Sequence, residues 1–214
     1  AMVNYSPARN DDAKKSVTAD IRDGLTYAFS EPTLRALFIM TFIPVLFGFS
    51  YYALIPAWAR EALNIQSDGL GILLMIMGVG ATVGTIGLAA LGNLRRRGIV
   101  MLSTSAAWGV ALAIFSQMSS FPLAVPFLLF IGLTSSVYMS MNMTMIQLNS
   151  DQKMRGRVMS ISMMTFGMMP LSAVPFGTIA QKIGTPDALM ISGILLASFT
   201  VLFAMFNRTF REIN

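Results

Sequence analysis

The stretch GLGILLMIMGVGATVGTIGLAALG, residues 69–92, decides the fold class because it contains no Asp, Glu, Lys or Arg. A helix rises 1.5 Å per residue, so about 20 apolar residues cross a bilayer core that is about 30 Å thick. Backbone amides in lipid have no water to bond, and a helix satisfies them within one segment. Residues 69–92 are therefore predicted to form a transmembrane helix.

Five further stretches of similar length also lack charged residues. The 15 Lys and Arg and the 10 Asp and Glu residues of the chain all lie outside them. The sequence therefore predicts an all-α membrane protein with six transmembrane helices. The expected spans are residues 36–59, 69–92, 99–118, 123–147, 158–180 and 188–206.

The composition supports this class. Of the 214 residues, 55% are hydrophobic and 12% are charged, and that charged share is about half of what soluble domains carry. This excludes a disordered chain and disfavours a soluble enzyme. The chain has no Cys and no His, which excludes a disulfide-built module and a Cys/His zinc site, so we expect neither a metal site nor a cofactor.

The charged residues also predict the domain plan and the orientation. We expect a cytoplasmic linker at 1–35, a six-helix bundle at 36–207 and a cytoplasmic tail at 208–214. If both termini are cytoplasmic, only Arg60 and Lys182 among the basic residues lie on the opposite side. Basic residues collect on the cytoplasmic side of membrane proteins, so the net charge of +5 indicates orientation and not a nucleic-acid partner.

Two elements next to the spans can be anticipated. Ile21, Leu25, Ala28 and Phe29 share one face at helical spacing. They predict a short amphipathic helix through residue 30 that packs under the bundle or lies on the cytoplasmic leaflet, rather than one that binds a partner. Trp58, near the end of the first span, is expected to be an interfacial aromatic residue.

Several motifs occur together in one order. Asp23-Gly24-Leu25-Thr26-Tyr27 precedes the first span, and the basic turn Leu94-Arg95-Arg96-Arg97-Gly98 follows the second. Asp151-Gln152-Lys153-Met154-Arg155-Gly156-Arg157-Val158-Met159-Ser160 follows the fourth span, and Ala180-Gln181-Lys182-Ile183-Gly184 precedes the sixth. This set resembles the C-terminal half of major facilitator superfamily transporters, and most closely the branch that contains the enterobactin exporter and related efflux proteins.

The resemblance implies that these helices are the seventh to twelfth of a twelve-helix transporter. It implies an efflux-type secondary transporter of small, siderophore-like or drug-like molecules in the bacterial inner membrane. Two halves would alternate access around a midplane site, each built of three-helix inverted repeats. The partners implied are the lipid bilayer, the substrate and an N-terminal six-helix half, or a second copy of the chain in its place.

The basic turns are expected to anchor the cytoplasmic side through Arg95, Arg96, Arg97, Arg155, Gly156 and Arg157. One departure from the family concerns the first of these turns, where the family often carries an Asp before the basic residues. The chain has Gly92-Asn93-Leu94 there. An Asn cannot make the charged contact of an Asp, so anchoring is the main role predicted for this turn.

The fourth span is the most polar. Ser135, Tyr138 and Asn142 share one face, and an Asn near the middle of a span is costly unless it has a polar neighbour. Lining of an aqueous substrate cavity is the functional interpretation, and hydrogen bonding between helices is the alternative. The candidate cavity residues, which include aromatic residues of the first span, are Phe49, Tyr52, Ser135, Tyr138, Asn142, Met163 and Phe166.

Glycine and proline mark two further spans. Gly80, Gly84 and Gly87 form a small-residue face that allows close helix approach, either as a rocking contact between transporter halves or as static packing. Pro170 and Pro175, with Gly167 and Gly177, predict a broken or bendable fifth span, or a merely kinked one.

Other functions were weighed against transport. Most of the 18 Met residues lie between Met139 and Met169, and thioethers bind Cu(I), so copper transport is a remote alternative to an adaptable apolar lining. No catalytic constellation or phosphate-binding loop is visible, so an enzyme is not expected. No span contains a carboxylate, so a proton-coupling group is expected in the other half. A six-helix scaffold, or an inactive half-transporter, would have the same sequence features.

Overall fold

The charge-free stretches lie in helices that are long and apolar enough to cross a membrane. The computed structural model describes residues 17–65, 67–92 and 96–211. These residues are mostly helical and contain no strand, which confirms the predicted fold class. The six spans run over Pro32–Leu63, Gly69–Leu91, Arg97–Ser116, Phe121–Leu148, Arg155–Ile183 and Thr185–Phe206.

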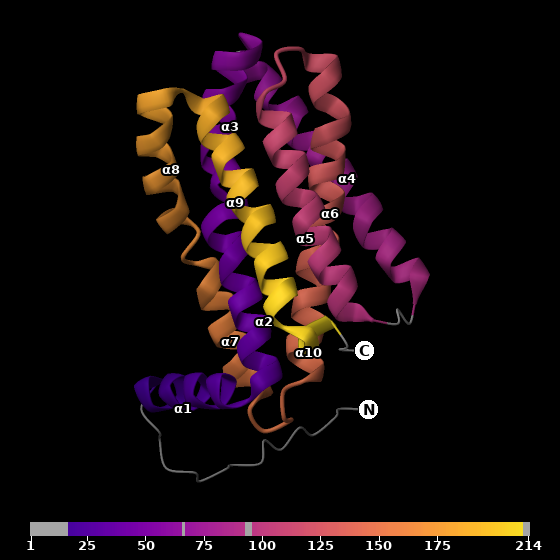
Figure 1. The fold of residues 1–214 in the computed structure, drawn as a ribbon, viewed down its shortest axis with the longest axis vertical. Helices are drawn as coiled ribbons and strands as arrows, with labels where there is room; N and C mark the ends of the chain where they lie inside the picture. The colour runs from indigo at the N-terminus through magenta and orange to yellow at the C-terminus, as the bar shows by residue number, and fades with distance from the viewer. Residues whose placement is uncertain (1–16, 66, 93–95, 212–214) are drawn as a thin grey trace, which may run out of the picture.

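The first and the fifth span are each built of more than one segment (Figure 1). A π-helix, η1, joins α2 to α3 in the first span, and a turn separates α7 from α8 in the fifth. The elements are α1 (Val17–Ser30), α2 (Pro32–Ile43), η1 (Pro44–Gly48), α3 (Ser50–Leu63), α4 (Ser67–Leu91), α5 (Arg97–Ser116), α6 (Phe121–Leu148), α7 (Arg155–Phe166), α8 (Pro170–Ile183), α9 (Thr185–Phe206) and α10 (Arg208–Arg211).

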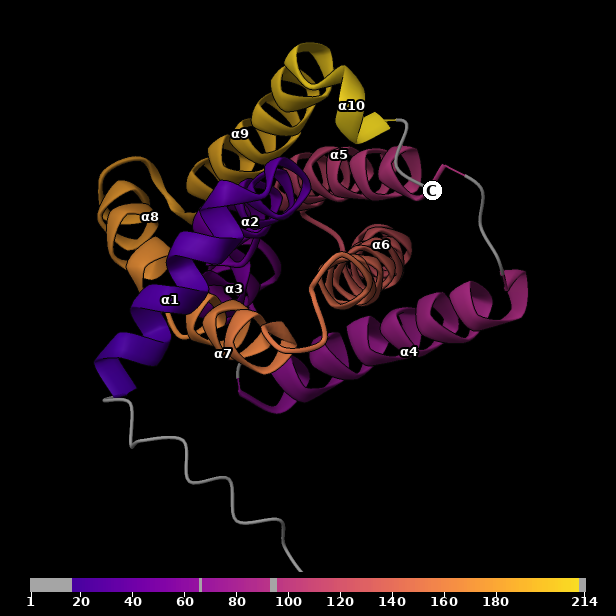
Figure 2. The ribbon, with the colours of Figure 1, turned by 90° about the horizontal axis from the view of Figure 1, so that it is seen from below.

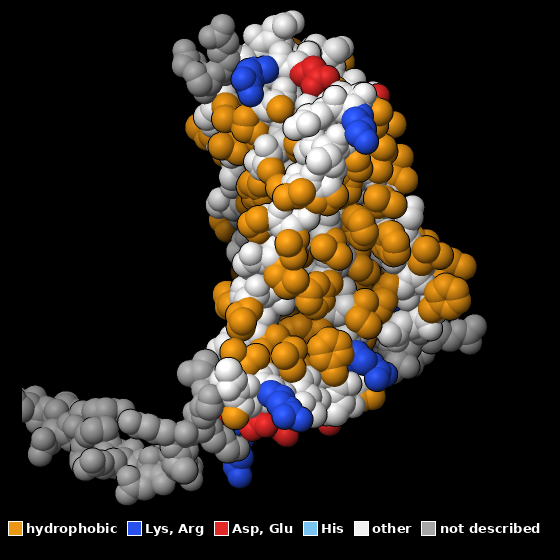
Figure 3. Space-filling view, turned by 90° about the vertical axis from the view of Figure 1, so that its left-hand side faces the viewer, with side chains coloured by type: hydrophobic (Ala, Val, Ile, Leu, Met, Phe, Trp, Pro, Cys, Tyr) orange, Lys and Arg blue, Asp and Glu red, His pale blue; other side chains and the backbone are white. Residues whose placement is uncertain are grey.

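The surface of the bundle has the pattern of a membrane protein. In the space-filling view, Lys, Arg, Asp and Glu side chains lie at the two ends, and a hydrophobic band fills the region between them (Figure 3). One end carries α1, α10 and the α6–α7 turn (Figure 1). The opposite end carries the α5–α6 and α8–α9 turns. The band between them is the part that lipid would surround.

Helix α1 lies across the end of the bundle, under α2 and α7 (Figure 2). This confirms the short helix predicted before the first span. Its buried face includes Gly24 and Ala28, whereas Leu25 and Phe29 are about two-fifths exposed. A carboxylate oxygen of Asp20 lies 2.7 Å from the guanidinium of Arg157 on α7. The helix is therefore fixed to the bundle and still presents an apolar edge.

Helices α5 and α9 approach each other through two glycines. A Cβ added at Gly109 would lie 2.7 Å from the carbonyl oxygen of Gly193, and one added at Gly193 would lie 2.5 Å from that of Gly109. Ser105 and Thr200 add a hydrogen bond of 3.0 Å between the same helices. The contact is reciprocal, as a two-fold axis between the two helices would make it.

The first span remains continuous through its proline. Pro44 cannot donate a backbone hydrogen bond, and the five residues Pro44–Gly48 form the π-helix. The hydroxyl of Ser192 on α9 donates to the carbonyl oxygen of Phe47. Ser50 donates to the same oxygen at 3.2 Å. Side chains thus supply hydrogen bonds where the regular backbone pattern is disturbed.

The fifth span is interrupted where the sequence predicts a break or a bend. Helix α7 ends at Phe166, and α8 starts at Pro170. Between them, the amide of Met168 donates to the carbonyl oxygen of Thr165 at 3.0 Å, and that of Met169 donates to Phe166 at 3.1 Å. These bonds span three residues and form a tight turn. Pro175 lies inside the continuous helix α8.

Trp58 corrects one expectation. Its side chain is fully buried, and its indole nitrogen donates to the carbonyl oxygen of Ser116 at 2.8 Å. Its ring lies 4.1 Å from the ring of Phe115. The prediction of an interfacial aromatic residue is therefore wrong, because the ring is covered by protein and the indole donates to a carbonyl at the end of α5.

Candidate substrate-binding face

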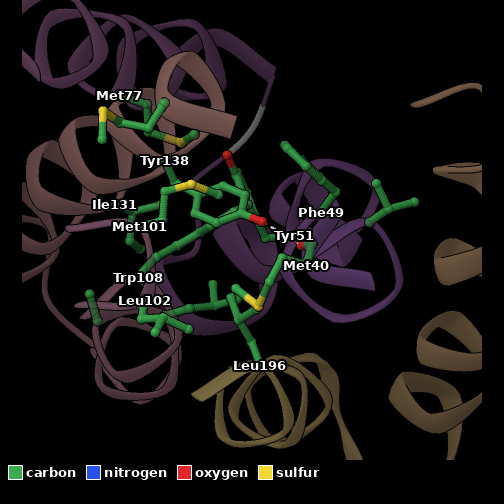
Figure 4. Packing of buried hydrophobic residues seen from close by; sticks show 14 of the residues in the cluster. Met40, Phe49, Tyr51, Met77, Met101, Leu102, Trp108, Ile131, Tyr138 and Leu196 are labelled. Atoms are coloured by element: carbon green, nitrogen blue, oxygen red, sulfur yellow. Dashed lines mark hydrogen bonds between the residues drawn. The ribbon is translucent and has the colours of Figure 1, made fainter. Parts of the chain in front are cut away.

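The polar face of the fourth span contacts the first span. The hydroxyl of Tyr138 on α6 donates to the carbonyl oxygen of Met40 on α2 (Figure 4). The side-chain amide of Asn142 donates to the hydroxyl of Thr41 at 3.0 Å and to that of Tyr138 at 3.1 Å. These bonds form a small polar network between α2 and α6 within the apolar bundle.

The three polar candidates of α6 are buried. The exposed fractions are 7% for Ser135, 2% for Tyr138 and 4% for Asn142. The Ser135 hydroxyl bonds back to the carbonyl oxygen of Gly132 at 3.1 Å. In this conformation the polar groups of Tyr138 and Asn142 therefore hold α6 against α2, which is the alternative that the sequence left open, whereas that of Ser135 bonds within α6. None of the three lines an open surface.

A second group of candidates forms an aromatic cluster near the surface. The ring of Phe49, at the junction of η1 and α3, lies 5.9 Å from the ring of Tyr52 and 6.3 Å from that of Phe166 on α7. Tyr52 is 53% exposed, and Met163, one turn before Phe166, is 52% exposed. The first and fifth spans, distant in sequence, thus bring four of the predicted residues to one face.

Trp108 on α5 links the two groups, and the sequence did not single it out. Its ring lies 5.0 Å from Phe49, 6.2 Å from Tyr51 and 6.4 Å from Tyr138. Figure 4 shows Trp108, Tyr51 and Tyr138 converging from different helices. The available signal was a Trp in the middle of a predicted span, where interfacial aromatic residues are not expected. No pattern in the sequence marked Thr41 as the partner of Asn142.

Two hydrogen-bonding groups in this cluster are buried and unused. Within the described part of the chain, the hydroxyl of Tyr51 and the indole nitrogen of Trp108 have no hydrogen-bond partner. Their side chains are 1% and 0% exposed. Unused buried donors cost free energy and call for an acceptor such as water or a ligand. The ring of Tyr51 stacks on the exposed ring of Tyr52 at 4.4 Å.

The glycines of α4 have different surroundings. A Cβ at Gly84 would lie 2.6 Å from the carbonyl oxygen of Leu133 on α6, and Gly80 is as closely packed against Leu129. Gly87 has no heavy atom within 4 Å of such a Cβ among the described neighbours. Gly80 and Gly84 therefore serve static packing inside this bundle, and a contact with another half can involve Gly87.

The predicted anchor residues lie at the α1 end of the bundle. Arg96 and Arg97 precede and start α5, and Arg155 is exposed at the start of α7. Arg157 pairs with Asp20, and Gly156 has open space around it. Arg95 lies outside the described residues, as do 1–16 of the expected linker and 212–214 of the expected tail.

The exposed cluster can contact an amphiphilic molecule. Aromatic rings and thioethers provide large, polarisable apolar surfaces, and a tyrosine hydroxyl adds a donor and an acceptor. Apolar pockets with a few polar groups are typical of small-molecule sites. The described face has these components, arranged around the interruption of the fifth span.

Comparison with known proteins identifies the family. A family model described as "transmembrane secretion effector" matches residues 3–213. The chain belongs to this family of the major facilitator superfamily. It is therefore an integral, multi-pass membrane protein, as the six apolar helices indicate.

Two curated members of the superfamily are similar to the chain. A staphyloferrin A transporter of Staphylococcus aureus (strain NCTC 8325 / PS 47) is 28% identical over 178 residues, which cover 81% of this chain and 44% of that protein. The multidrug efflux pump Tap of Mycolicibacterium fortuitum is 23% identical over 202 residues, which cover 94% of this chain and 49% of that protein. The chain thus spans about half the length of the curated relatives it matches.

Proposed function

We propose that the chain supplies one six-helix half of a secondary transporter that exports small molecules by alternating access. Family membership supports transport, and the coverage of its relatives supports a half. The observation that carries the proposal is the group formed by the exposed Tyr52 and Met163 and the partly buried Phe166. These residues lie in the middle of spans, beside the break in the fifth span.

The remaining helices would come from an N-terminal half or from a second copy of this chain. They would cover the exposed face and complete a substrate path at the interface between halves. The carboxylates within the spans, Glu61 and Asp187, lie at the span ends and not in the middle of the membrane, so a group that couples transport to protons would lie in that other half. The function requires no cofactor, catalytic group or nucleic-acid partner.

We infer a bacterial inner-membrane location with both termini in the cytoplasm. The arrangement of charges supports this orientation, since Arg96, Arg97, Arg155 and Arg157 lie near α1 whereas Arg60 and Lys182 lie near the opposite end. A reversed chain would place most basic residues outside, against the positive-inside rule.

The substrate class follows from the side chains and from the relatives. Rings and thioethers favour large, partly apolar molecules with hydrogen-bond acceptors that the hydroxyl of the exposed Tyr52 can reach. The relatives are named as a siderophore transporter and a multidrug efflux pump. We propose that this chain exports siderophore-like or drug-like compounds.

The test is an efflux assay in bacteria that lack their major efflux pumps. The chain is expressed alone and together with the polypeptide that supplies the other six helices, and efflux of aryl siderophores and cationic dyes is measured. We expect Tyr52→Ala and Met163→Ala to slow efflux by about fivefold or more, as loss of one favourable contact of about 1 kcal/mol implies. Val201→Ala is the matched control, because Val201 is also about half exposed but lies on α9.

Four outcomes decide the proposal. Efflux that needs both polypeptides and falls in the Tyr52 and Met163 variants supports it. Efflux by the chain alone, with crosslinks between copies, supports the second-copy form. Absence of efflux for every compound, with a correctly folded chain in the membrane, would favour a six-helix scaffold and overturn the proposal. Copper-dependent growth changed by Met143 and Met164 substitutions would favour the copper alternative.

A further inference from the structure

A groove lies at the α1 end of the bundle, where α2 begins and α10 folds under the spans. Its volume is about 210 Å³, and its lining residues are Pro32, Thr33, Arg35, Ala36, Ile39, Asn207 and Phe210. A water molecule takes up about 30 Å³, so the groove has room for a phosphate-sized group. The groove lies where the first span begins and the sixth span ends, at the depth of lipid headgroups.

The polar groups of the groove are donors. Arg35 is exposed, and within the described residues it has no ion-pair partner. Asn207 uses its side-chain oxygen to accept a hydrogen bond of 3.1 Å from the amide of Phe210, which leaves its NH₂ group free to donate. Thr33 adds a hydroxyl, and the lining contains no carboxylate. This donor set suits an anion.

The groove is apolar on its membrane side. Ile39 lies one turn beyond Arg35 on α2, so the two side chains share a face of the helix. Its side chain is 40% exposed. A molecule that occupied the groove would meet a cation and two polar groups at the end of the bundle and an apolar surface toward the membrane centre.

We propose that the groove binds an anionic phospholipid of the adjacent leaflet, with its phosphate on Arg35 and an acyl chain along Ile39. A guanidinium can bind a phosphate through two parallel hydrogen bonds. The protein spans the bilayer, so lipids surround this end of α2. Arg157 provides a contrast on the same side, because Asp20 already neutralises it at 2.7 Å. The inference is independent of the transported substrate.

The experiment is a lipid titration of the detergent-purified chain followed by native mass spectrometry. The probes are phosphatidylglycerol, phosphatidylcholine and inorganic phosphate. We expect retention of phosphatidylglycerol to fall about fivefold in Arg35→Gln, which corresponds to the contribution of one cation near an anionic lipid surface. Arg155→Gln is the matched control, since it removes one exposed cation from the same side. Arg35→Lys keeps the charge and should bind at an intermediate level.

The outcomes separate the possible ligands. Selective loss of phosphatidylglycerol in Arg35→Gln, but not in Arg155→Gln, supports the proposal. Equal loss in both variants would indicate general surface charge and overturn it. Equal retention of phosphatidylcholine, or binding of inorganic phosphate with the same affinity as the lipid, would overturn the assignment of an anionic lipid. Thermal unfolding of each variant shows whether a loss of lipid binding comes from misfolding. If Arg35→Gln misfolds, the lipid retention of Arg35→Lys tests the proposal in its place.

Discussion

The first and the fifth span each contain a proline near mid-membrane, yet the two prolines have different effects. At Pro44 the first span continues as a π-helix, and Pro44 is buried. At Pro170 the fifth span stops and restarts after a turn, and the flanking Met168 and Leu171 are exposed. A proline removes the same backbone donor in both places.

The neighbours account for the difference. Pro44 removes the donor that would bond to the carbonyl oxygen of Met40 one turn earlier, and the hydroxyl of Tyr138 on α6 donates to that oxygen instead. Ser192 of α9 and Ser50 supply hydroxyl donors to the carbonyl oxygen of Phe47 within the π-helix. The turn at residues 167–169 is held by its own short-range backbone hydrogen bonds. A proline in a membrane helix therefore gives a continuous, irregular helix where an adjacent helix supplies polar groups. It gives a break where only the local backbone supplies hydrogen bonds.

The two halves of the fifth span also have different supports. Helix α7 contacts α1, α2 and α6, whereas α8 contacts α3, α9 and η1. Both halves thus contact the first span, but α7 also contacts α1 and α6 whereas α8 contacts α9, and the break adjoins the exposed Met163 and the partly buried Phe166. Under the proposed function, this break would be the hinge of alternating access, and the first span would be the fixed reference.

The largest effect is expected from Gly193→Leu, which disturbs the packing of α9, the helix whose Ser192 bonds to the first span. Its Cβ would lie 2.6 Å from the amide nitrogen of Ala113, and backbone cannot yield as a side chain can. Overpacking of this kind should lower the free energy of unfolding by about 3 kcal/mol or more. Denaturant unfolding of the purified protein measures it. Gly87→Leu is the control, and equal destabilisation by both would refute the packing argument.

A smaller loss of stability is expected when the two serine hydroxyls that bond to the π-helix are removed. Ser50→Ala with Ser192→Ala leaves the Phe47 carbonyl oxygen without these donors, which should cost about 1–3 kcal/mol of unfolding free energy. The same unfolding assay applies, and Ser198→Ala controls for an exposed serine of α9. If the double variant is as stable as Ser198→Ala, neighbouring side chains do not maintain the first span.

The smallest effect on stability is expected at the break itself. Pro170→Ala restores a backbone donor and should favour a continuous fifth span. We expect unfolding to change by less than about 1 kcal/mol, while efflux falls about threefold to tenfold because the coupling between α7 and α8 changes. Efflux and amide hydrogen exchange at residues 167–169 provide the measurements. Pro175→Ala, inside α8, is the matched control, and an equal effect there would contradict the hinge.

Prediction from sequence worked best where one residue class carries the information. The absence of charge over residues 69–92 identifies a span without any knowledge of neighbours, because lipid tolerates almost no alternative to an apolar helix. The break near Pro170 was also predicted from local residues, because a proline lacks a backbone donor whatever its neighbours are. The burial of Trp58 was not, since its position at a span end fits both an interfacial ring and a ring packed against the last turn of α5.

The candidate site was predictable in part. The aromatic residues of the first span and the polar face of the fourth were identified from their spacing. The sequence did not predict that they separate into a buried group with Tyr138 and Asn142 and an exposed group with Tyr52 and Met163. That division depends on which helix faces Met40 and Thr41, and helical periodicity fixes a face without fixing its neighbour.

The sequence alone determined the number of spans, their approximate limits, the asymmetry of charge and the family, because these depend on local composition and motifs. The tertiary structure decided which glycines are packed, which proline breaks its helix, and which polar groups are already used within the bundle. Those properties arise from contacts between segments that are distant in sequence, such as Ser192 with Phe47 or Asn142 with Thr41. A helix makes its own backbone hydrogen bonds, but its neighbours determine which of its side chains are buried, bonded or exposed.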